Sequence, residues 1–200
     1  MKFSSQEIKE IFIAWLLSSL AFAILFSGGY MFFSSLNAFF LSFLISSLTV
    51  GIGFLFHELM HKFTAQKYGL FAEFRAFYNM LFLALLFSFF GFIVIVPGAV
   101  FIRGRMNKEK NGKIALAGPF ANILLAFLFL IFLLLFKFEG IFNLLFSYGL
   151  YINSLLALFN LLPFSFFDGS KVLKWNKKIY TFFLIIAGFL FFLTFSLLSP

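Results

Sequence analysis

Six stretches of this chain are apolar over about the 20 residues that an α-helix needs to cross the hydrocarbon core of a bilayer. They cover residues 11–26, 36–56, 81–102, 114–136, 141–162 and 180–198. Hydrophobic residues make up 63% of the 200 residues and charged residues only 11%, against about 25% charged in a soluble domain. The sequence therefore predicts an all-α polytopic membrane protein, with residues 1–200 forming a single integral membrane domain in the lipid bilayer.

The basic residues indicate which of these stretches cross the membrane. If all six crossed, the five basic residues from Arg103 to Lys113 would face outward, although Lys and Arg prefer the cytoplasmic side. If residues 81–102 instead enter and return on one side, 14 of the 15 Lys and Arg residues are cytoplasmic and only Lys137 is outside. The formal net charge of +8 then belongs to cytoplasmic loops, and no nucleic-acid partner is expected.

Residues that break helices lie inside the stretch 81–102, at Gly91, Pro97 and Gly98. Non-helical backbone at membrane depth must be buried in protein or line a cavity. We therefore predict five transmembrane helices and a re-entrant or strand-like hairpin around residues 81–102, with six transmembrane helices as the alternative. The N-terminus is cytoplasmic in this topology, and the expected location is the cell membrane of a prokaryote.

The sequence HELMH directly follows the second apolar stretch and contains His57, Glu58 and His61. Residues i and i+4 share one face of a helix, so the two imidazoles can bind one Zn²⁺ while Glu58 serves as general base. These are the only two histidines of the chain, and ionisable groups inside a membrane segment are costly and usually functional. Because Lys62 marks the cytoplasmic end of this helix, we expect the site to lie just inside the hydrocarbon and to open towards the cytoplasm.

A catalytic zinc site has three protein ligands and leaves a further position for water. The chain has no cysteine and no third histidine, so the third ligand must be a carboxylate. Asp168 follows Pro163, which interrupts an apolar helix, and precedes Gly169; apart from Glu58, the other acids lie in charged, loop-like surroundings. We predict that Asp168 completes a site for one zinc ion per chain. The alternative is that Asp168 caps the helix that follows.

Together these stretches resemble the site-2 protease family of intramembrane zinc metalloproteases. That family pairs HExxH on one transmembrane helix with a later Asn-x-x-Pro and Asp-Gly stretch, which here reads Asn160 to Pro163 followed by Asp168-Gly169. LAGPFAN at 116–122 is similar to the Ala-Gly-Pro motif of the family's intervening core helix. PGAVFI at 97–102 is similar to the strand-like segment before that helix.

The resemblance covers residues 37–175 and indicates a compact form without PDZ or CBS domains. The chain departs from the family at Met60, where a small residue is common, and at Ser170-Lys171, where Gly-Arg is common. The resemblance implies hydrolysis of peptide bonds within or near transmembrane segments of membrane-protein substrates, as in regulated intramembrane proteolysis. The two histidines and the aspartate would hold zinc, and the glutamate of HELMH would transfer the proton.

Further expectations concern the substrate. The amides of Asn160 and Asn122 could stabilise an oxyanion, or could only hydrogen-bond between helices. An extended edge at Gly98, Ala99 and Val100 could pair with an unwound substrate as an added strand, or could be a turn. No oligomeric state follows from the sequence.

Two other functions fit part of the pattern. A non-proteolytic zinc-binding protein, such as a metal transporter, would also carry an intramembrane histidine pair, but transporters often contain several intramembrane charges or internal repeats. An unrelated HExxH protease, such as those that process prenylated C-termini, would need a third ligand other than Asp168.

Overall fold

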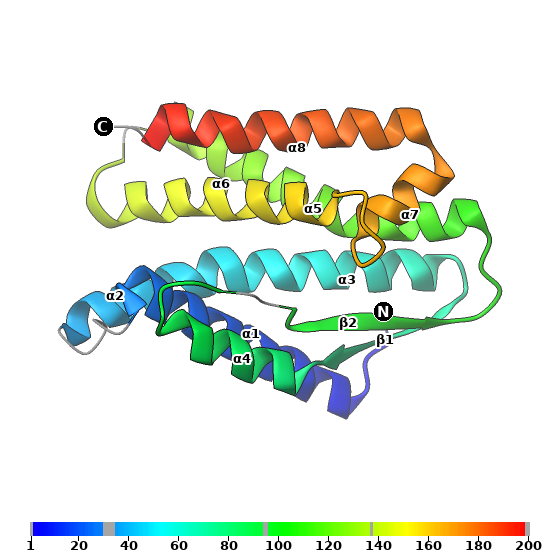
Figure 1. Ribbon diagram of the computed structural model, residues 1–200, viewed down its shortest axis with the longest axis horizontal. Coiled ribbons are helices and arrows are strands. Elements are labelled where there is room, and N and C mark those ends of the chain that lie inside the picture. Colours follow the sequence, from blue (N-terminus) through cyan, green and yellow to red (C-terminus); the bar gives the residue numbers. More distant parts are fainter. Residues whose placement is uncertain (1, 30–34, 94–95, 137, 199–200) are drawn as a thin grey trace. The chain divides into compact units, whose positions relative to one another are not determined.

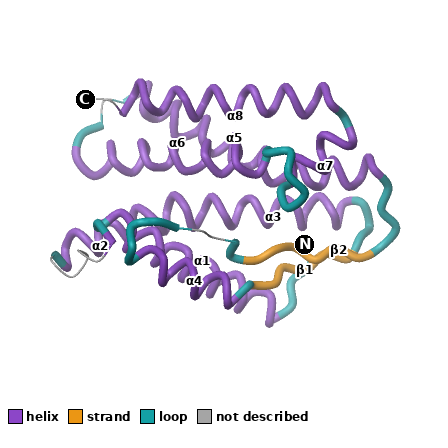
Figure 2. Tube along the Cα trace, in the orientation of Figure 1, coloured by secondary structure: helices purple, strands orange, loops and turns teal. Residues whose placement is uncertain are grey.

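A computed structural model describes residues 2–29, 35–93, 96–136 and 138–198 (Figures 1 and 2). Among these residues, five helical stretches are long and apolar enough to cross a membrane. They are α1 (Ser5–Phe26), the stretch Leu36–Lys67, α5 (Lys108–Leu135), α6 (Gly140–Asn160) and α8 (Lys177–Leu198). The predicted all-α polytopic membrane fold is confirmed, and Lys137 lies outside the described residues.

The second of these stretches consists of three helical segments in succession: α2 (Leu36–Ser46), a π-helical turn (Ser47–Gly51) and α3 (Ile52–Lys67). Gly51 lies so close to α1 that a Cβ atom at this position would overlap the Trp15 ring. The indole N–H of Trp15 also donates to the carbonyl of Ser47 at 3.2 Å. A glycine in the π-helical turn therefore allows α1 to pack directly against this stretch.

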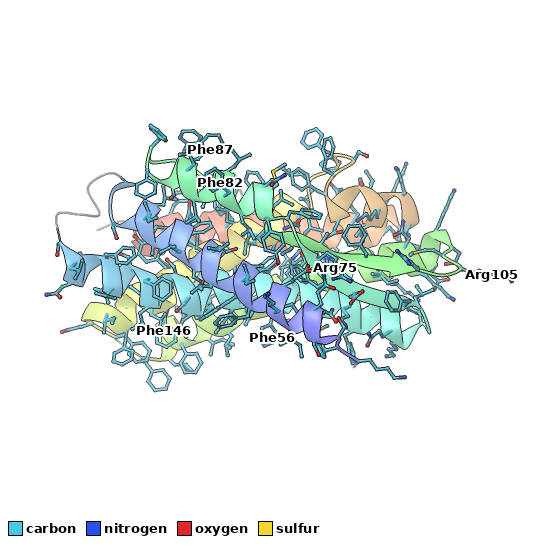
Figure 3. All side chains as sticks on the ribbon, turned by 90° about the horizontal axis from the view of Figure 1, so that it is seen from below. Phe56, Arg75, Phe82, Phe87, Arg105 and Phe146 are labelled. Carbon is cyan, nitrogen blue, oxygen red and sulfur yellow. The ribbon has the colours of Figure 1, made fainter. Side chains whose placement is uncertain are left out.

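Residues 81–102 do not form a transmembrane helix. They contain most of α4 (Tyr78–Ser88) and then β2 (Gly98–Arg103), while residues 94 and 95 lie outside the described part. The 11 residues of α4 measure about 16 Å, roughly half of the hydrocarbon core. Its surface is nevertheless apolar: Phe82, labelled in Figure 3, is 65% exposed. A strand-like segment is therefore present at the end of this stretch, where β2 pairs with β1 (Phe71–Ala76), and the return of the chain to the same side of the membrane stays a prediction.

The chain divides into two compact units, and each is described by itself. One unit contains Met1–Leu55 and Glu73–Phe101, and the other contains Phe56–Ala72 and Ile102–Pro200. The helix α3 begins in the first unit and ends in the second. That the whole chain acts as one membrane domain stays a prediction.

In the first unit, α1 packs against α2 and α4, and its first turns hold β1 through two glutamates. Glu7 accepts a hydrogen bond from the backbone N–H of Phe74 at 2.8 Å, and Glu10 accepts one from that of Ala76 at 2.9 Å. Both glutamates are buried, and Glu10 also pairs with Arg75 at 3.2 Å. We call Glu7 and Glu10 the acidic clamp.

The expectation that the acids other than Glu58 and Asp168 lie in loop-like surroundings is wrong for the acidic clamp. The helix α1 begins earlier than the apolar stretch, because the Ser4 hydroxyl caps it by accepting a hydrogen bond from the N–H of Glu7. The first turns of α1 therefore carry polar side chains into the protein, where backbone N–H groups of β1 satisfy them.

In the second unit, α5 packs along α6 and also contacts α7 (Asp168–Trp175), while α8 lies along α6 (Figure 1). The apolar core between α5, α6 and α8 includes Ile123, Leu150 and Leu190, all nearly inaccessible to solvent. The short helix α7 contacts α5 as well as α8, which follows it. The polar residues described next are buried in this framework.

Candidate metal centre

The helix α3 places His57 and His61 side by side. They are separated by one helical turn, and their ring centroids are 4.7 Å apart. Both residues are buried, with 6% and 8% of their surfaces exposed. The two imidazoles therefore face the same interior point of the second unit.

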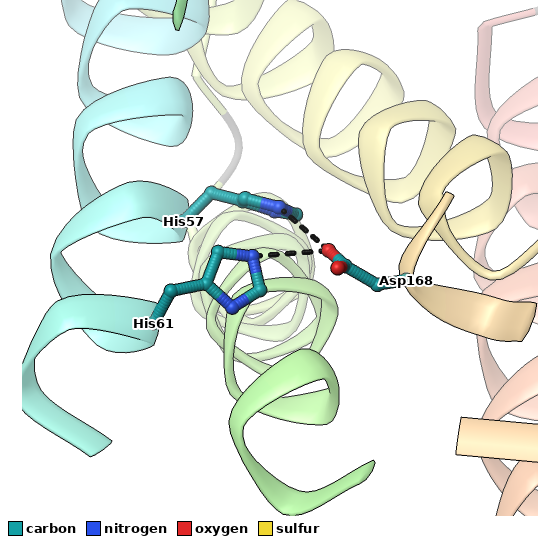
Figure 4. A group of neighbouring side chains, drawn as sticks. All are labelled: His57, His61 and Asp168. Atoms are coloured by element: carbon teal, nitrogen blue, oxygen red, sulfur yellow. Dashed lines mark ion pairs between the residues drawn. The ribbon is translucent and has the colours of Figure 1, made fainter. Parts of the chain in front are cut away.

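Asp168 reaches that point from the first residue of α7 (Figure 4). Its Oδ2 atom lies 3.0 Å from His61 Nε2 and 3.3 Å from His57 Nε2. The following glycine makes this turn possible, because a Cβ at Gly169 would lie 2.6 Å from the carbonyl oxygen of Leu162. The capping interpretation of Asp168 is wrong, since Phe167 occupies the N-cap position and no side chain caps α7.

The outer nitrogen of each imidazole is bound to an acceptor. His61 Nδ1 lies 2.8 Å from the carbonyl oxygen of Ile114, and His57 Nδ1 lies 2.6 Å from Oδ1 of Asn122. A carbonyl oxygen can only accept a hydrogen bond, so Nδ1 of each ring carries the proton. In the neutral ring, Nε2 then has the lone pair that binds a metal.

The inner atoms of the cluster are the ligand set that zinc prefers. Two Nε2 atoms and a carboxylate oxygen lie within 4.8 Å of one another, and two neutral imidazoles would present only lone pairs to the carboxylate. A cation placed among them removes that repulsion. Tetrahedral zinc with bonds of about 2.0–2.2 Å sets its ligand atoms roughly 3.3–3.6 Å apart. Asp168 Oδ2 lies at similar distances, 3.3 and 3.0 Å, from the two Nε2 atoms. The residues present therefore fit a zinc ion.

Asp168 is held in its ionised form. Burial alone would raise the pKa of its carboxyl group. While no cation is bound, the positive charge of a protonated His61 and hydrogen bonds from both imidazoles, whose Nε2 atoms carry protons only in this state, hold that pKa well below its usual range. The second carboxylate oxygen, Oδ1, accepts a hydrogen bond from the ammonium group of Lys171 at 3.1 Å. The carboxylate thus turns one oxygen towards the histidines and the other towards a cation of its own helix.

A glycine of α5, Gly118, lies directly against the two imidazoles. A Cβ at Gly118 would lie 2.6 Å from His57 Nε2 and even closer to His61 Nε2. Any other residue at this position would occupy the space that a bound metal needs. Gly118 lies within the predicted 116–122 motif, but nothing in the sequence alone placed it against the histidines.

The remaining predicted site residues lie in several places. Glu58 is half-buried on α3 between the two histidines, and its role as general base stays a prediction. Asn160 ends α6, and its amide donates to the carbonyl of Leu156 one turn earlier at 2.9 Å. Gly98, Ala99 and Val100 belong to β2, in the other compact unit. The substrate roles of these four residues, like that of Asn122, stay predictions.

Asn122 is at the cluster, and it contacts a second asparagine that the sequence analysis missed. Its amide nitrogen donates to Oδ1 of Asn153 on α6 at 3.1 Å. Both asparagines are fully buried. A polar residue in the middle of an apolar helix was the signal available for Asn153, but that signal does not reveal its partner.

The chain is similar to a curated protein of Methanocaldococcus jannaschii named "Putative zinc metalloprotease". The two are 47% identical over 181 residues, which cover 90% of this chain and 89% of that protein. No protein-family model matches the chain, and no solved structure matches it. At this identity and coverage, the chain belongs to the same family as the Methanocaldococcus jannaschii protein, a family of zinc metalloproteases.

Proposed function

We propose that this protein is an intramembrane zinc protease of the site-2 type, which hydrolyses peptide bonds within or near transmembrane segments of other membrane proteins. The observation that carries this proposal is the position of the ligand set. His57 and His61 lie on a helical stretch apolar enough to span a membrane, and Asp168 joins them in a buried site. A peptide bond reaching this site would belong to a substrate segment inside or beside the bilayer.

In this mechanism His57, His61 and Asp168 would hold the metal. Zinc bound there would supply Lewis acidity for the hydrolysis. Glu58 takes a proton from the attacking water and returns it to the leaving nitrogen, a transfer that contributes about 10²–10⁴-fold to rate in enzymes. The Ile114 carbonyl and the Asn122 amide keep Nδ1 of each histidine protonated, so both Nε2 atoms stay available to the metal.

The substrate would bind as a strand added to the sheet at β2. A helical substrate hides its carbonyl groups in backbone hydrogen bonds, so it must unwind before it can be cut. Two backbone N–H groups of β1 are already bound by the acidic clamp, which leaves β1 poorly suited to accept another strand. Gly98, Ala99 and Val100 are extended in β2, as this role requires.

The proposed orientation places the N-terminus and the opening of the site in the cytoplasm of the cell. Single-cysteine labelling tests it without background, because the chain has no cysteine. An impermeant thiol reagent added to intact cells should label Glu139→Cys, between α5 and α6, and should spare Arg105→Cys, between β2 and α5. Both positions are exposed, and the reverse labelling pattern would contradict the orientation.

The deciding experiment measures zinc content and cleavage of a membrane-embedded model substrate in three proteins. Wild type should bind one zinc ion and cleave. Glu58→Gln should keep zinc while its cleavage rate falls about 10²–10⁴-fold. Asp168→Ala should lose both, because a ligand is missing. A wild type that binds zinc, with no hydrolysis affected by Glu58→Gln, would identify a zinc-binding membrane protein that is not a protease.

A further inference from the structure

A chain of buried amides connects His57 to the backbone of α6. Asn122 Oδ1 lies 2.6 Å from His57 Nδ1, and the amide nitrogen of Asn122 donates to Asn153 Oδ1 at 3.1 Å. The amide nitrogen of Asn153 in turn donates to the carbonyl oxygen of Gly149 at 2.9 Å. Both asparagines have no exposed surface, so bulk solvent does not compete for these bonds.

The Gly149 carbonyl determines which atom donates and which accepts in each hydrogen bond between it and His57. The Gly149 carbonyl can only accept, so Asn153 must turn its NH₂ group towards it and its oxygen towards Asn122. That oxygen also only accepts, so Asn122 must present its NH₂ group to Asn153 and its own oxygen to His57. His57 Nδ1 must then donate, which leaves Nε2 as the atom that faces Asp168.

The opposite orientation would remove His57 from the ligand set. If the Asn122 amide were reversed, its NH₂ group would face Nδ1, and the proton of the neutral ring would move to Nε2. A protonated Nε2 has no lone pair for a metal. Nothing in Asn122 alone prevents this reversal, because its side chain is nearly symmetrical in shape.

We infer that Asn153 is a positioning residue for the metal centre, which sets the orientation of Asn122 and thereby the tautomer of His57. This inference rests on the proposed function, because it assumes that His57 binds zinc through Nε2. His61 needs no such intermediary, since its Nδ1 contacts the Ile114 backbone directly. The two histidines therefore depend on backbone carbonyls in different ways, one directly and one through two side chains.

The packing of α5 against α6 brings the two asparagines within reach. A Cβ at Gly149 would lie 2.5 Å from the Phe129 ring of α5, so a glycine allows the close approach of the two helices. The same residue supplies the carbonyl at the end of the chain of amides. Asn153 is thus placed by α6 itself, independently of the metal.

The test measures zinc affinity by competition with a chelator, using purified full-length protein. Asn153→Leu keeps the side-chain volume but removes both hydrogen bonds, and should weaken zinc binding about tenfold, the lower end of the loss found when partners of metal ligands are removed. Asn153→Ala removes the same bonds without the branched side chain. Ser154→Ala is the matched control: Ser154 is also fully buried on α6, but its hydroxyl donates to Tyr151 of its own helix.

Repeating the Asn153→Leu substitution in an Asn122→Asp protein distinguishes a role of Asn153 in orienting residue 122 from a role in helix packing. In Asn122→Asp, the carboxylate can only accept from His57 Nδ1, so its orientation needs no help from Asn153. Adding Asn153→Leu to this variant should therefore change zinc affinity less than about threefold, in contrast to its effect in wild type. Because the chain has only two histidines, ¹⁵N-histidine NMR of the zinc-loaded protein can also follow solvent exchange of the His57 Nδ1 proton, which should be faster in Asn153→Leu.

The outcomes separate the inference from the proposed function. Equal losses of zinc affinity in both backgrounds, or no loss in either, would overturn the role of Asn153 while leaving the protease proposal intact. Absence of zinc binding in wild type would overturn both. A protein that binds zinc with the expected pattern of losses, yet cleaves nothing, would support the positioning role and contradict the protease.

Discussion

The acidic clamp and the metal centre are both buried polar regions, but they differ in how their charges are balanced. In the clamp, each glutamate is bound by donors of the protein, namely backbone N–H groups of β1 and, for Glu10, the Arg75 guanidinium. At the metal centre, protein acceptors bind the outer nitrogen of each histidine, and the inner atoms face one another across a short gap.

This difference shows that burial of an acid does not identify a metal site. Glu7 and Asp168 are both buried, yet Glu7 holds a strand and Asp168 turns an oxygen towards two imidazoles. What distinguishes the metal centre is the convergence of two imidazole nitrogens and a carboxylate oxygen on one point, a set that can hold a metal ion. Changes to the metal centre should therefore affect zinc binding without altering β1. Changes to the acidic clamp should affect β1 without altering zinc binding.

The largest effect is expected for Gly118→Ala. The added methyl group would overlap the space between the two Nε2 atoms, so zinc affinity should fall by about 100-fold or more, the upper range for altered metal surroundings. Gly188→Ala on α8 is the matched control, because a Cβ there meets no atom within 4 Å. Chelator competition measures both, and equal affinities would show that the metal does not occupy this space.

A smaller effect, on cleavage only, is expected for Ala99→Pro. Proline removes a backbone N–H group from β2 and restricts its backbone, so strand addition should be impaired. Cleavage of a helical substrate should fall about tenfold, equivalent to about 1.4 kcal/mol of transition-state stabilisation, while zinc affinity stays unchanged. Met106→Pro, in the loop after β2, serves as control. Parallel losses of zinc affinity and cleavage would contradict a role limited to the substrate.

The smallest effect is expected for Glu10→Gln, which removes a charge from the acidic clamp but keeps an oxygen for the Ala76 N–H. Losing the charge-assisted bond to Arg75 should lower the midpoint of thermal unfolding by about 2–4 °C, with zinc affinity unchanged. Glu109→Gln removes an acid from an exposed ion pair with Lys113 and should shift the midpoint much less. A loss of zinc from Glu10→Gln would show that the two regions are coupled.

The number of transmembrane helices could be predicted because length, apolar composition and the position of basic residues are properties of each segment. For residues 81–102, length and apolar composition alone would predict a transmembrane helix that the structure does not contain. Only the charge pattern and residues such as Gly91 and Pro97 indicated otherwise. The short α4 could not be foreseen, because its ends depend on the turn and on the pairing of β2 with β1.

The convergence of His57, His61 and Asp168 could be predicted because the chain offers few other metal ligands: it has two histidines, no cysteine and seven acids. Gly118 and Asn153 could not, since their importance depends on helices that meet only in the folded protein. The acidic clamp was missed for the same reason. Its glutamates precede the apolar stretch, and the strand that binds them comes more than 60 residues later.

The order of the ligands along the chain has a consequence for the moment at which activity can arise. The two histidines are synthesised with α3, but Asp168 follows them by more than 100 residues, after α5 and α6. During synthesis, therefore, α5 and α6 exist before the ligand set is complete. Ribosome-bound chains ending before residue 168 should retain no zinc, so the protease that we propose cannot cut its neighbours before α7 has been synthesised.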